Sequence, residues 1–354
     1  MHSGMSRSKS VWGKRQHIAF CFLPLMVFPL LGLGIYGRGA WLLLPVFFLL
    51  VALPFLDLFT GWQDDVHFEP GDFSRVEIVL LNWNARIYAL LYIGSITWLV
   101  LHIRRFTAAE TGLLIWDMSL VAGICFAAAH ELLHAKERID QILQRITTSI
   151  LFYPHYKLIH IRSHHVHVGT EHDENTAWFN EGIYTYLLRT VPGSMLRCWQ
   201  MEARPGGQRS VAADMFRNKM IFYAVGQLGL LLFLYWLSGL WGLLFYLAHI
   251  AGAHIVLESV NYIQHYGLLR ERHEGGYEKP GAEHSWDTYH FFSSYATFRV
   301  GHHSYHHLAV QPYYLLGTEP KAPTLPVGYL WSIAMVLLPP WWRRVMNPKL
   351  KPAT

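Results

Sequence analysis

Apolar residues gather in six long runs along this chain. About 20 apolar residues are needed for a helix to cross the ~30 Å hydrocarbon core of a bilayer. Short turns or polar segments separate the runs, and Ser238-Gly239 joins the last two, which predicts a hairpin of two helices. The predicted membrane spans are 18–36, 40–59, 87–103, 112–129, 220–240 and 241–260.

Proline and aromatic residues refine this pattern. Pro24 and Pro29 fall inside the first run and should kink it, because proline removes a helical hydrogen bond. The first run lacks a small-residue cleavage site and the second follows at once, so we expect a retained helix. A last apolar piece, 327–342, is short and ends in tryptophan, which favours a position at the membrane interface.

The composition agrees with an all-α membrane protein. Hydrophobic residues make up 52% of the 354 positions and charged residues only 15%, against about a quarter in soluble domains. The net charge of +5 is modest, and no basic stripe with interleaved aromatics points to nucleic acid. We expect one membrane domain, residues 1–354, with six transmembrane helices.

The basic N-terminus sets the predicted orientation, because lysine and arginine favour the cytoplasmic side of a membrane. With six spans, both termini and the polar segments 135–218 and 262–354 face the cytoplasm from the inner membrane. Arg104 and Arg105 fall on the other side, against the trend. The basic residues used here are Arg7, Lys9, Lys14 and Arg15.

Histidine is the unusual residue of this chain. Of 22 histidines, 18 fall between His130 and His307. The three cysteines, in contrast, are far apart and form no CxxC pair, which excludes a rubredoxin-type, iron–sulfur or zinc-ribbon site within the chain. These cysteines are Cys21, Cys125 and Cys198.

The histidines form four clusters with helical spacing, all on the predicted cytoplasmic face. His130 and His134 stand one turn apart, and His160 and His164 repeat that spacing. Neutral imidazole is a good ligand for iron, zinc or copper, and nine imidazoles exceed what one ion holds, so two metals fit. Spacing alone does not separate iron from zinc, since zinc proteases also use HExxH. The nine candidate ligands are His130, His134, His160, His164, His165, His265, His303, His306 and His307.

Several strings resemble one known family, the integral-membrane alkane 1-monooxygenases, with the xylene monooxygenase hydroxylase component as a close relative. The stretches at 52–57 and 340–349 resemble the same family, so the likeness covers nearly the whole chain. The Asn-Tyr-x-x-His-Tyr-Gly string distinguishes this family from ordinary membrane fatty-acid desaturases, which share histidine boxes. The strings are His-Glu-Leu-Leu-His-Ala-Lys-Glu at 130–137, His-x-x-x-His-His at 160–165, Asn-Tyr-Ile-Gln-His-Tyr-Gly-Leu-Leu-Arg at 261–270, His-Ser-Trp at 284–286 and His-x-x-His-His at 303–307.

The resemblance implies a non-haem di-iron site, two Fe held by the nine histidines, with no catalytic group beyond the metal ligands. It implies that one oxygen atom from O2 enters a terminal C–H bond of an alkane or alkyl group, giving a primary alcohol. Electrons would come from rubredoxin or a ferredoxin-type donor with an NAD(P)H-dependent reductase. The missing cysteine pairs agree with a separate donor.

The chain departs from the family pattern in places. Ile159 precedes the second box, where an acid is usual, and Gln264 replaces the Glu common in the alkane branch. The fourth box reads Arg-Val-Gly-His-His at 299–303 instead of Leu-Gln-Arg-His, which makes the register ambiguous. We take His303 over His302 because it preserves the i, i+3, i+4 set. No ligand is lost, but the substrate class stays open.

Residues around the metal and along the substrate path are also predicted. Ligating histidines normally donate their second N–H to a carboxylate or carbonyl. The candidates for such supporting contacts are Glu131, Asp173, Glu258, Asn261 and His284. An apolar substrate would enter from the bilayer between helices. The candidate channel residues, for which lipid contact or packing is the alternative role, are Leu49, Leu50, Leu53, Ile124 and Ala127.

Two kinds of rival function remain open at this point. The first is another membrane di-iron enzyme, either a lipid desaturase or an aromatic-methyl (xylene-type) hydroxylase. The second is a membrane metal transporter or metal-storage protein. Transport favours ionisable groups near the midplane along several spans, whereas here they gather at helix ends, which argues against a transporter.

Overall fold

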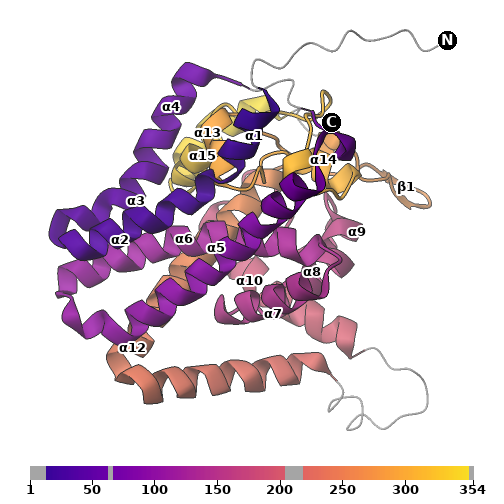
Figure 1. The fold of residues 1–354 in the computed structure, drawn as a ribbon. Helices are drawn as coiled ribbons and strands as arrows, with labels where there is room; N and C mark the ends of the chain where they lie inside the picture. Colours follow the sequence, from indigo (N-terminus) through magenta and orange to yellow (C-terminus); the bar gives the residue numbers. More distant parts are fainter. Residues whose placement is uncertain (1–12, 63–66, 204–217, 351–354) are drawn as a thin grey trace.

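The computed structural model describes residues 13–62, 67–203 and 218–350, and their regular structure is almost entirely helical (Figure 1). Arg7 and Lys9, on which the predicted orientation partly rests, lie outside these ranges. The described strands are β1 (Arg272–His273) and β2 (Gly276–Tyr277), which form one small antiparallel hairpin. The expected all-α class is therefore confirmed apart from this hairpin.

Four helical stretches are long and apolar enough to cross a membrane. A bent pair at the N-terminus gives a fifth if it is one span. Length and composition thus give four or five spans among the described residues, against the six expected. The four stretches are Gly39–Thr60, Arg75–Arg105, Ala108–His134 and Lys219–His265.

The last stretch, α12 (Lys219–His265), consists of two helical arms. Its backbone breaks at Gly239, where φ is 69° and ψ is −171°, in the left-handed region that glycine tolerates. The break falls at the predicted hairpin turn, and Figure 1 shows two arms that meet there at a sharp bend. The first arm exposes apolar side chains such as Phe222 and Trp236, as a lipid-facing helix would. A sixth span therefore stays a prediction.

The N-terminal helices show the expected kink at one proline. Helix α1 (Lys14–Cys21) is followed by a 3-10 turn (Leu23–Met26) and α2 (Val27–Gly37), with a bend of 41°. Pro24 lies at this bend. Pro29 lies in the first turn of α2, where backbone N–H groups have no helical partner, so it does not break the helix.

Helix α5 (Arg75–His102) begins twelve residues before the predicted span at 87. Ser74 caps it by accepting a hydrogen bond from the Glu77 N–H. Two charged residues of its first half, Glu77 and Arg86, have ion-pair partners, which pattern reasoning could not foresee. The Arg86 guanidinium donates to Asp140 of α7 (Arg138–Ile150) at 2.6 Å and is buried there.

Helix α6 (Ala108–His134) lies at the centre, packed against α5 and α12. It continues five residues past the predicted end at 129, so His130 and His134 occupy its last turn. The polar end of the fold is built from α10 (Ile183–Glu202), which has 20 residues, and from shorter helices around that turn. The shorter ones are α8 (Tyr156–Ile159), a π-helical segment (His160–His164), α9 (His165–His167), α13 (Phe291–Ala296), α14 (His303–Leu308), α15 (Tyr329–Val336) and α16 (Pro339–Met346).

The stretch Gly39–Thr60 is not a uniform helix. It runs through a 3-10 turn (Gly39–Leu43), α3 (Leu44–Phe47), a π-helical segment (Phe48–Ala52) and α4 (Leu53–Thr60). Asp57 near its end accepts hydrogen bonds from the Phe292 and Ser293 N–H groups at the start of α13. This carboxylate therefore connects the stretch Gly39–Thr60 to the polar end of the fold. The remaining 3-10 turns are Pro70–Asp72, Ile103–Arg105, Ala282–His284, Tyr313–Leu315 and Asn347–Lys349.

Candidate metal centre

The nine histidines singled out by spacing converge at the polar end of the fold, in two neighbouring groups. In each group, one ring nitrogen per residue lies within 4.8 Å of all the others. Both groups draw on segments far apart in the chain. The first histidine group is His130, His134, His160, His165 and His306. The second histidine group is His164, His265, His303 and His307.

The first histidine group is centred on His160. The His160 Nε2 lies 3.0 Å from the Nε2 of His130, 3.2 Å from that of His134 and 3.0 Å from that of His165. His306 completes the group, 3.3 Å from His165. The His160 Nε2 cannot form good hydrogen bonds with three other ring nitrogens, because it carries either one proton to donate or one lone pair to accept with. A central cation satisfies all five lone pairs at once.

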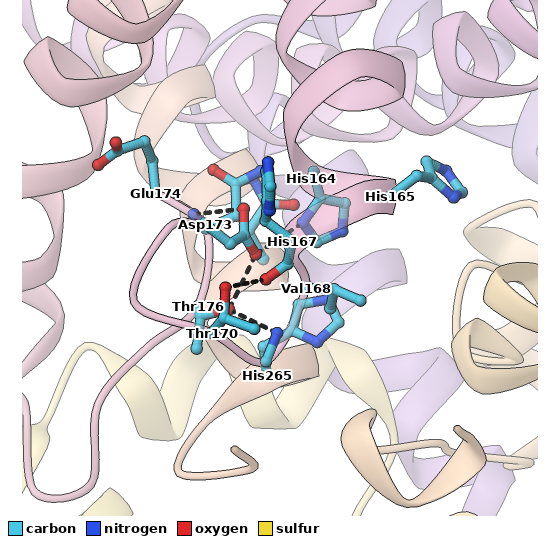
Figure 2. Close-up of polar contacts among 12 residues, drawn as sticks. His164, His165, His167, Val168, Thr170, Asp173, Glu174, Thr176 and His265 are labelled. Carbon is cyan, nitrogen blue, oxygen red and sulfur yellow. Dashed lines mark hydrogen bonds and ion pairs between the residues drawn. The ribbon is translucent and has the colours of Figure 1, made fainter. Parts of the chain in front are cut away.

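The second histidine group is more deeply buried than the first. Hydrogen bonds to the Nδ1 atoms of His164 and His265 fix the orientation of these two rings. Asp173 accepts a hydrogen bond from the His164 Nδ1–H at 3.0 Å, as Figure 2 shows. The His265 Nδ1–H donates to the backbone carbonyl of His284 at 3.1 Å. With both Nδ1 atoms protonated, each Nε2 keeps its lone pair for a metal.

Burial lowers the pKa of eight of these imidazoles and so favours the neutral form that metal ligands must have. Burial, followed by the neighbouring His164 and His134, lowers the pKa of His165 to about 3. Burial likewise holds the pKa of His160 and His303 well below the usual range. The donor sets contain only imidazole nitrogen and therefore fit iron, zinc or copper as a class.

A π-helical segment explains how histidines of one box, the second, serve different groups. His160 and His164 bound this segment, in which the His165 N–H bonds the His160 carbonyl five residues back. The wider turn directs His160 to the first group and His164 to the second. In Figure 2 the His165 ring extends away from His164 and His265. Single π turns are frequent at functional sites, but the sequence pattern did not reveal this one.

Helix α14 supplies ligands to both groups and is held by an acid that sequence reasoning missed. Asp287 is fully buried and accepts hydrogen bonds from the Ser304 N–H at 2.8 Å and the Ser304 hydroxyl at 2.6 Å. Burial raises the pKa of Asp287 to about 7, although these bonds oppose the shift. The available signal was its place directly after the His-Ser-Trp string.

The register ambiguity at the fourth box is resolved in geometry. His303 belongs to the second histidine group, whereas the His302 ring turns away. The His302 Nδ1–H donates to the Gly317 carbonyl at 2.8 Å, and its Nε2 lies near Ser294 and Arg299.

The predicted supporting residues differ in whether they contact a cluster histidine. Asp173 contacts a cluster histidine through its side chain, and His284 does so only through its carbonyl. The Glu131 carboxylate instead accepts from the Tyr313 N–H at 2.9 Å. Glu258 accepts from Asn261 at 3.1 Å, and in the described part of the chain neither bonds a cluster histidine. No hydrogen bond to a cluster histidine is therefore described for Glu131, Glu258 or Asn261, and their orienting roles stay predictions.

The His284 side chain belongs to a third group of possible ligand atoms, with Glu278 and Glu283. Its Nδ1 accepts a hydrogen bond from the Gly281 N–H at 2.9 Å, so Nε2 carries the proton. That Nε2–H donates to Glu278 at 3.0 Å. Both ring nitrogens are thus occupied, and this cluster is an internal hydrogen-bond network.

An apolar cavity of about 50 Å³ reaches both histidine groups. His130 and His160 of the first group and His303 of the second line it, together with side chains of α6, α12 and α15. Four of the five predicted channel residues are among its walls, namely Leu49, Leu50, Ile124 and Ala127. Leu53 is not a wall residue of this cavity but packs in the core.

A second, more polar cavity of about 390 Å³ approaches the first histidine group from another side. Its walls include His134 and Glu131 on α6 and charged residues that follow this helix, such as Lys136 and Glu137. The centre therefore lies between an apolar space and a polar one.

Comparison with known proteins gives a consistent picture. The fatty acid desaturase family model matches residues 110–318, which are 209 of 354 positions. Alkane 1-monooxygenase 1 of Pseudomonas aeruginosa is 33% identical over 245 residues, 68% of this chain and 64% of that protein. Alkane 1-monooxygenase 2 of the same organism is 31% identical over 345 residues, 94% of this chain and 90% of that protein.

A more distant relative is the xylene/toluene monooxygenase hydroxylase component of Pseudomonas putida, 24% identical over 225 residues, 63% of this chain and 60% of that protein. The chain spans just under two thirds of the first alkane relative and of the xylene relative, but nearly all of the second alkane relative. On the strength of that near full-length match and the desaturase-type segment around the histidines, the chain belongs to the alkane 1-monooxygenase family of oxidoreductases.

Proposed function

We propose that this protein is a membrane non-haem di-iron monooxygenase that hydroxylates a terminal C–H bond of an alkane or alkyl group to a primary alcohol. The observation that carries the proposal is the meeting of two all-histidine groups at the end of an apolar cavity. The alkane and xylene monooxygenase relatives support the same reaction class.

The nine histidines would hold the two iron ions, the first group with five imidazoles and the second with four. Iron bound there would supply the activation of O2. Asp173 and the His284 carbonyl fix the tautomer and direction of His164 and His265, so the second group is preorganised before a metal arrives.

The apolar cavity would position the substrate. A hydrocarbon offers no hydrogen-bonding group, so its orientation depends on the shape of the walls and on the water they exclude. Leu50, Ile124 and Ala127 supply such walls, while His130 and His303 define the reacting end. A chain end placed against those rings exposes its terminal C–H bond to the metals.

Electrons would come from outside the chain. All three cysteines are buried, free thiols, far from forming a rubredoxin-type site. We therefore propose a rubredoxin or ferredoxin-type donor with an NAD(P)H-dependent reductase, acting at the cytoplasmic face of the inner membrane. Reconstitution with each donor in turn tests this part.

Whole-cell conversion of C6–C16 alkanes and of xylene, with co-expressed rubredoxin and reductase, tests the function. A primary alcohol from an alkane is the expected product. A benzylic alcohol from xylene alone would move the substrate to the aromatic-methyl class, and an alkene would indicate a desaturase. Cells carrying His134→Ala should form no product, which controls for host enzymes.

A further inference from the structure

Helix α7 exposes apolar side chains and buries polar ones, the reverse of the pattern of a helix at a water-exposed surface. Ile139, Ile142 and Ile146 share one face, at positions i, i+3 and i+7, and each is 47% exposed. Leu143 is the one apolar residue among those that α7 buries. The other buried residues of this helix are Asp140, Gln144, Thr147 and Thr148. The isoleucine face, defined by the three exposed isoleucines, is therefore suited to an apolar surrounding.

The last backbone carbonyls of α7 are all bonded within the protein. A helix leaves its last four carbonyls without a helical partner, and at a wet surface water satisfies them. Here the Thr147 and Thr148 carbonyls accept from the Leu151 N–H at 2.8 Å and the Tyr153 N–H at 2.7 Å. The next three carbonyls, those of Ser149, Ile150 and Leu151, accept from side chains of α12.

Three polar side chains of α12 serve this helix end. The Gln227 Nε2–H donates to Ser149 at 3.1 Å, the Tyr246 hydroxyl to Ile150 at 2.6 Å and the His254 Nε2–H to Leu151 at 2.9 Å. Helix α12 is one of the stretches apolar enough to cross a membrane. In hydrocarbon every backbone polar group must find its partner within the protein. The complete pairing of this helix end is what that surrounding requires.

The same contacts show how far α7 reaches from the metal centre. Tyr246 precedes His265 of the second histidine group by 19 residues, about 28 Å of helix axis at ~1.5 Å per residue. Gln227 follows Lys219, the first residue of α12, by eight residues, about 12 Å. Helix α7 therefore begins four residues after His134 and ends beside the middle of the membrane-crossing stretch.

The neighbours of α7 also expose apolar side chains. It lies between α5, through Arg86 and Asp140, and the first arm of α12, through Gln227 and Ser149 (Figure 1). Apolar residues of these two neighbours that are more than half exposed include Leu90, Val225 and Leu228. A bilayer that covers these residues reaches α7 from both sides.

The chain returns from the end of α7 inside the protein. Phe152 has a φ of 58°, in the left-handed region, and turns the chain back toward α8 and His160. Leu151, Tyr153 and His155 on this return are buried. Non-helical backbone at membrane depth is tolerated only where protein surrounds it, so the return segment meets this condition.

We propose that α7 is a re-entrant helix, which enters the hydrocarbon layer from the polar end and places its isoleucine face against lipid acyl chains. With 13 residues, about 20 Å, it is too short to cross ~30 Å of hydrocarbon and has to turn back. This position differs from the cytoplasmic one predicted for 135–218. The inference goes beyond the proposed function and does not depend on it.

Arg145 is the charged residue that this position has to accommodate, because it is exposed on α7. Side chains of a helix tilt toward its N-terminus, which here is the polar end. The long stem of an arginine can cover apolar surface while its guanidinium reaches water. Arg145 is therefore compatible with a helix that descends from Arg138.

The lipid-facing helix also connects the segments that carry the first histidine group. The Gln141 Nε2–H donates to the Leu132 and Leu133 carbonyls at 3.3 and 3.2 Å, at the end of α6 where His134 stands. The Gln141 Oε1 accepts from Lys157, three residues before His160. The bilayer thus contacts the element that joins these two segments.

Nitroxide labels at Ile139→Cys, Ile142→Cys and Ile146→Cys, one at a time in proteoliposomes, test the inference. The three native cysteines are buried, and labelled wild type gives the background. Collision rates with O2, which concentrates in hydrocarbon, and with a water-soluble nickel complex report depth. Leu228→Cys on α12 is the lipid control, and Glu171→Cys, whose carboxylate is 53% exposed, is the aqueous control.

Depth should increase from position 139 to 146 by about 10 Å, the axial rise of seven residues. Position 146 should resemble Leu228→Cys and differ from Glu171→Cys. Equal depth at all three positions would mean a helix flat on the membrane surface, and access to nickel at all three would mean a cytoplasmic helix. Low collision rates with both reagents would mean that protein, such as a second copy, covers the face. Each of these three results would overturn the inference.

A measurement on wild type avoids substitutions in α7. The protein is placed in liposomes with a phospholipid that carries a photoactivated diazirine at the end of its acyl chain. Trypsin cuts after Arg138, Arg145 and Lys157, which separates 139–145 from 146–157. Peptide 146–157 should carry more label than 139–145. Label in 220–270 of α12 with none in either of these peptides would overturn the inference.

Discussion

Single residues that hydrogen-bond the histidines decide how well the second group is preorganised for metal binding. Asp173 accepts from His164, and it also accepts from the Thr176 hydroxyl at 2.8 Å, so the carboxylate is itself held in place. Although burial alone would raise the pKa of Asp173, the adjacent His164 holds it below the usual range. The acid is therefore charged when it orients the imidazole.

Asp173→Asn should weaken metal binding to the second histidine group about 10–100-fold, because the amide can present its NH2 to His164 and loses the charge. The metal held by the first group should remain. Metal titration with readout by mass spectrometry measures both. Glu171→Gln is the control, since that exposed carboxylate lies 3.9 Å from His172 and Arg272 at the surface. Equal metal loss in the two variants would exclude an orienting role.

Adjacent histidines at the fourth box should give opposite phenotypes. His303→Ala should lose the metal of the second group while the protein remains folded. His302→Ala should keep both metals but lower the free energy of unfolding by about 1–3 kcal/mol, because the buried Gly317 carbonyl loses its donor. Metal content and melting temperature of the two purified variants distinguish these outcomes, and metal loss in His302→Ala would contradict the assignment.

Residue spacing identified which rings gather but not how they divide. His303, His306 and His307 share a face of α14, yet His306 joins the first group and the other two join the second. The division depends on tertiary placement between facing elements. Spacing within one helix carries no such information.

Elements at the polar end depend on a few buried acids. Helix α14 has only six residues and cannot be stable alone, since isolated helices shorter than ~12–15 residues are marginal. Asp287 holds its first turn, and Asp57 does the same for α13. The resemblance included the stretch that ends at Asp57, but its contact partner could not be read from the sequence.

Asp287→Ala should therefore affect both metals at once. Loss of this cap should lower the free energy of unfolding by about 1–3 kcal/mol and release ligands of both groups. Asp287→Asn, which keeps one acceptor oxygen, should be milder. Metal content and thermal unfolding are the readouts. Full metal content in Asp287→Ala would show that α14 is positioned by other contacts.

Helix boundaries are the feature of the fold that the hydrophobic pattern alone did not predict. Helix α5 begins before the predicted span 87–103, and α6 extends beyond the predicted span 112–129 at both ends, while the span limits themselves stay predictions. Capping by Ser74 and Thr107 and the burial of Arg86 extend both helices. The turn at Gly239 was predicted correctly because glycine and serine there interrupt two apolar runs.

At the scale of the whole molecule, the centre separates an apolar cavity from a polar one. His134 of the first histidine group lines the polar cavity. Of the second group, within the described chain, His303 alone lines either of these two cavities, and it lines the apolar one. Water therefore has a wider approach to the first group. The second is shielded, with His265 fully buried.

The two metals should consequently exchange with solution at different rates. On addition of a water-soluble chelator, metal from the first group should leave in a fast phase and metal from the second in a slower one. Ala85→Phe, which fills the polar cavity, should slow only the fast phase. Release is followed by absorbance of the chelate. A single phase for both metals, unchanged by Ala85→Phe, would contradict this difference in access.

The most direct test of the account is the iron content per polypeptide of protein that is purified from membranes and converts octane to 1-octanol. The account predicts two irons per chain, with one lost in His134→Ala and the other in His265→Ala. Active wild-type protein that carries zinc instead, no metal, or a single iron per chain would contradict it.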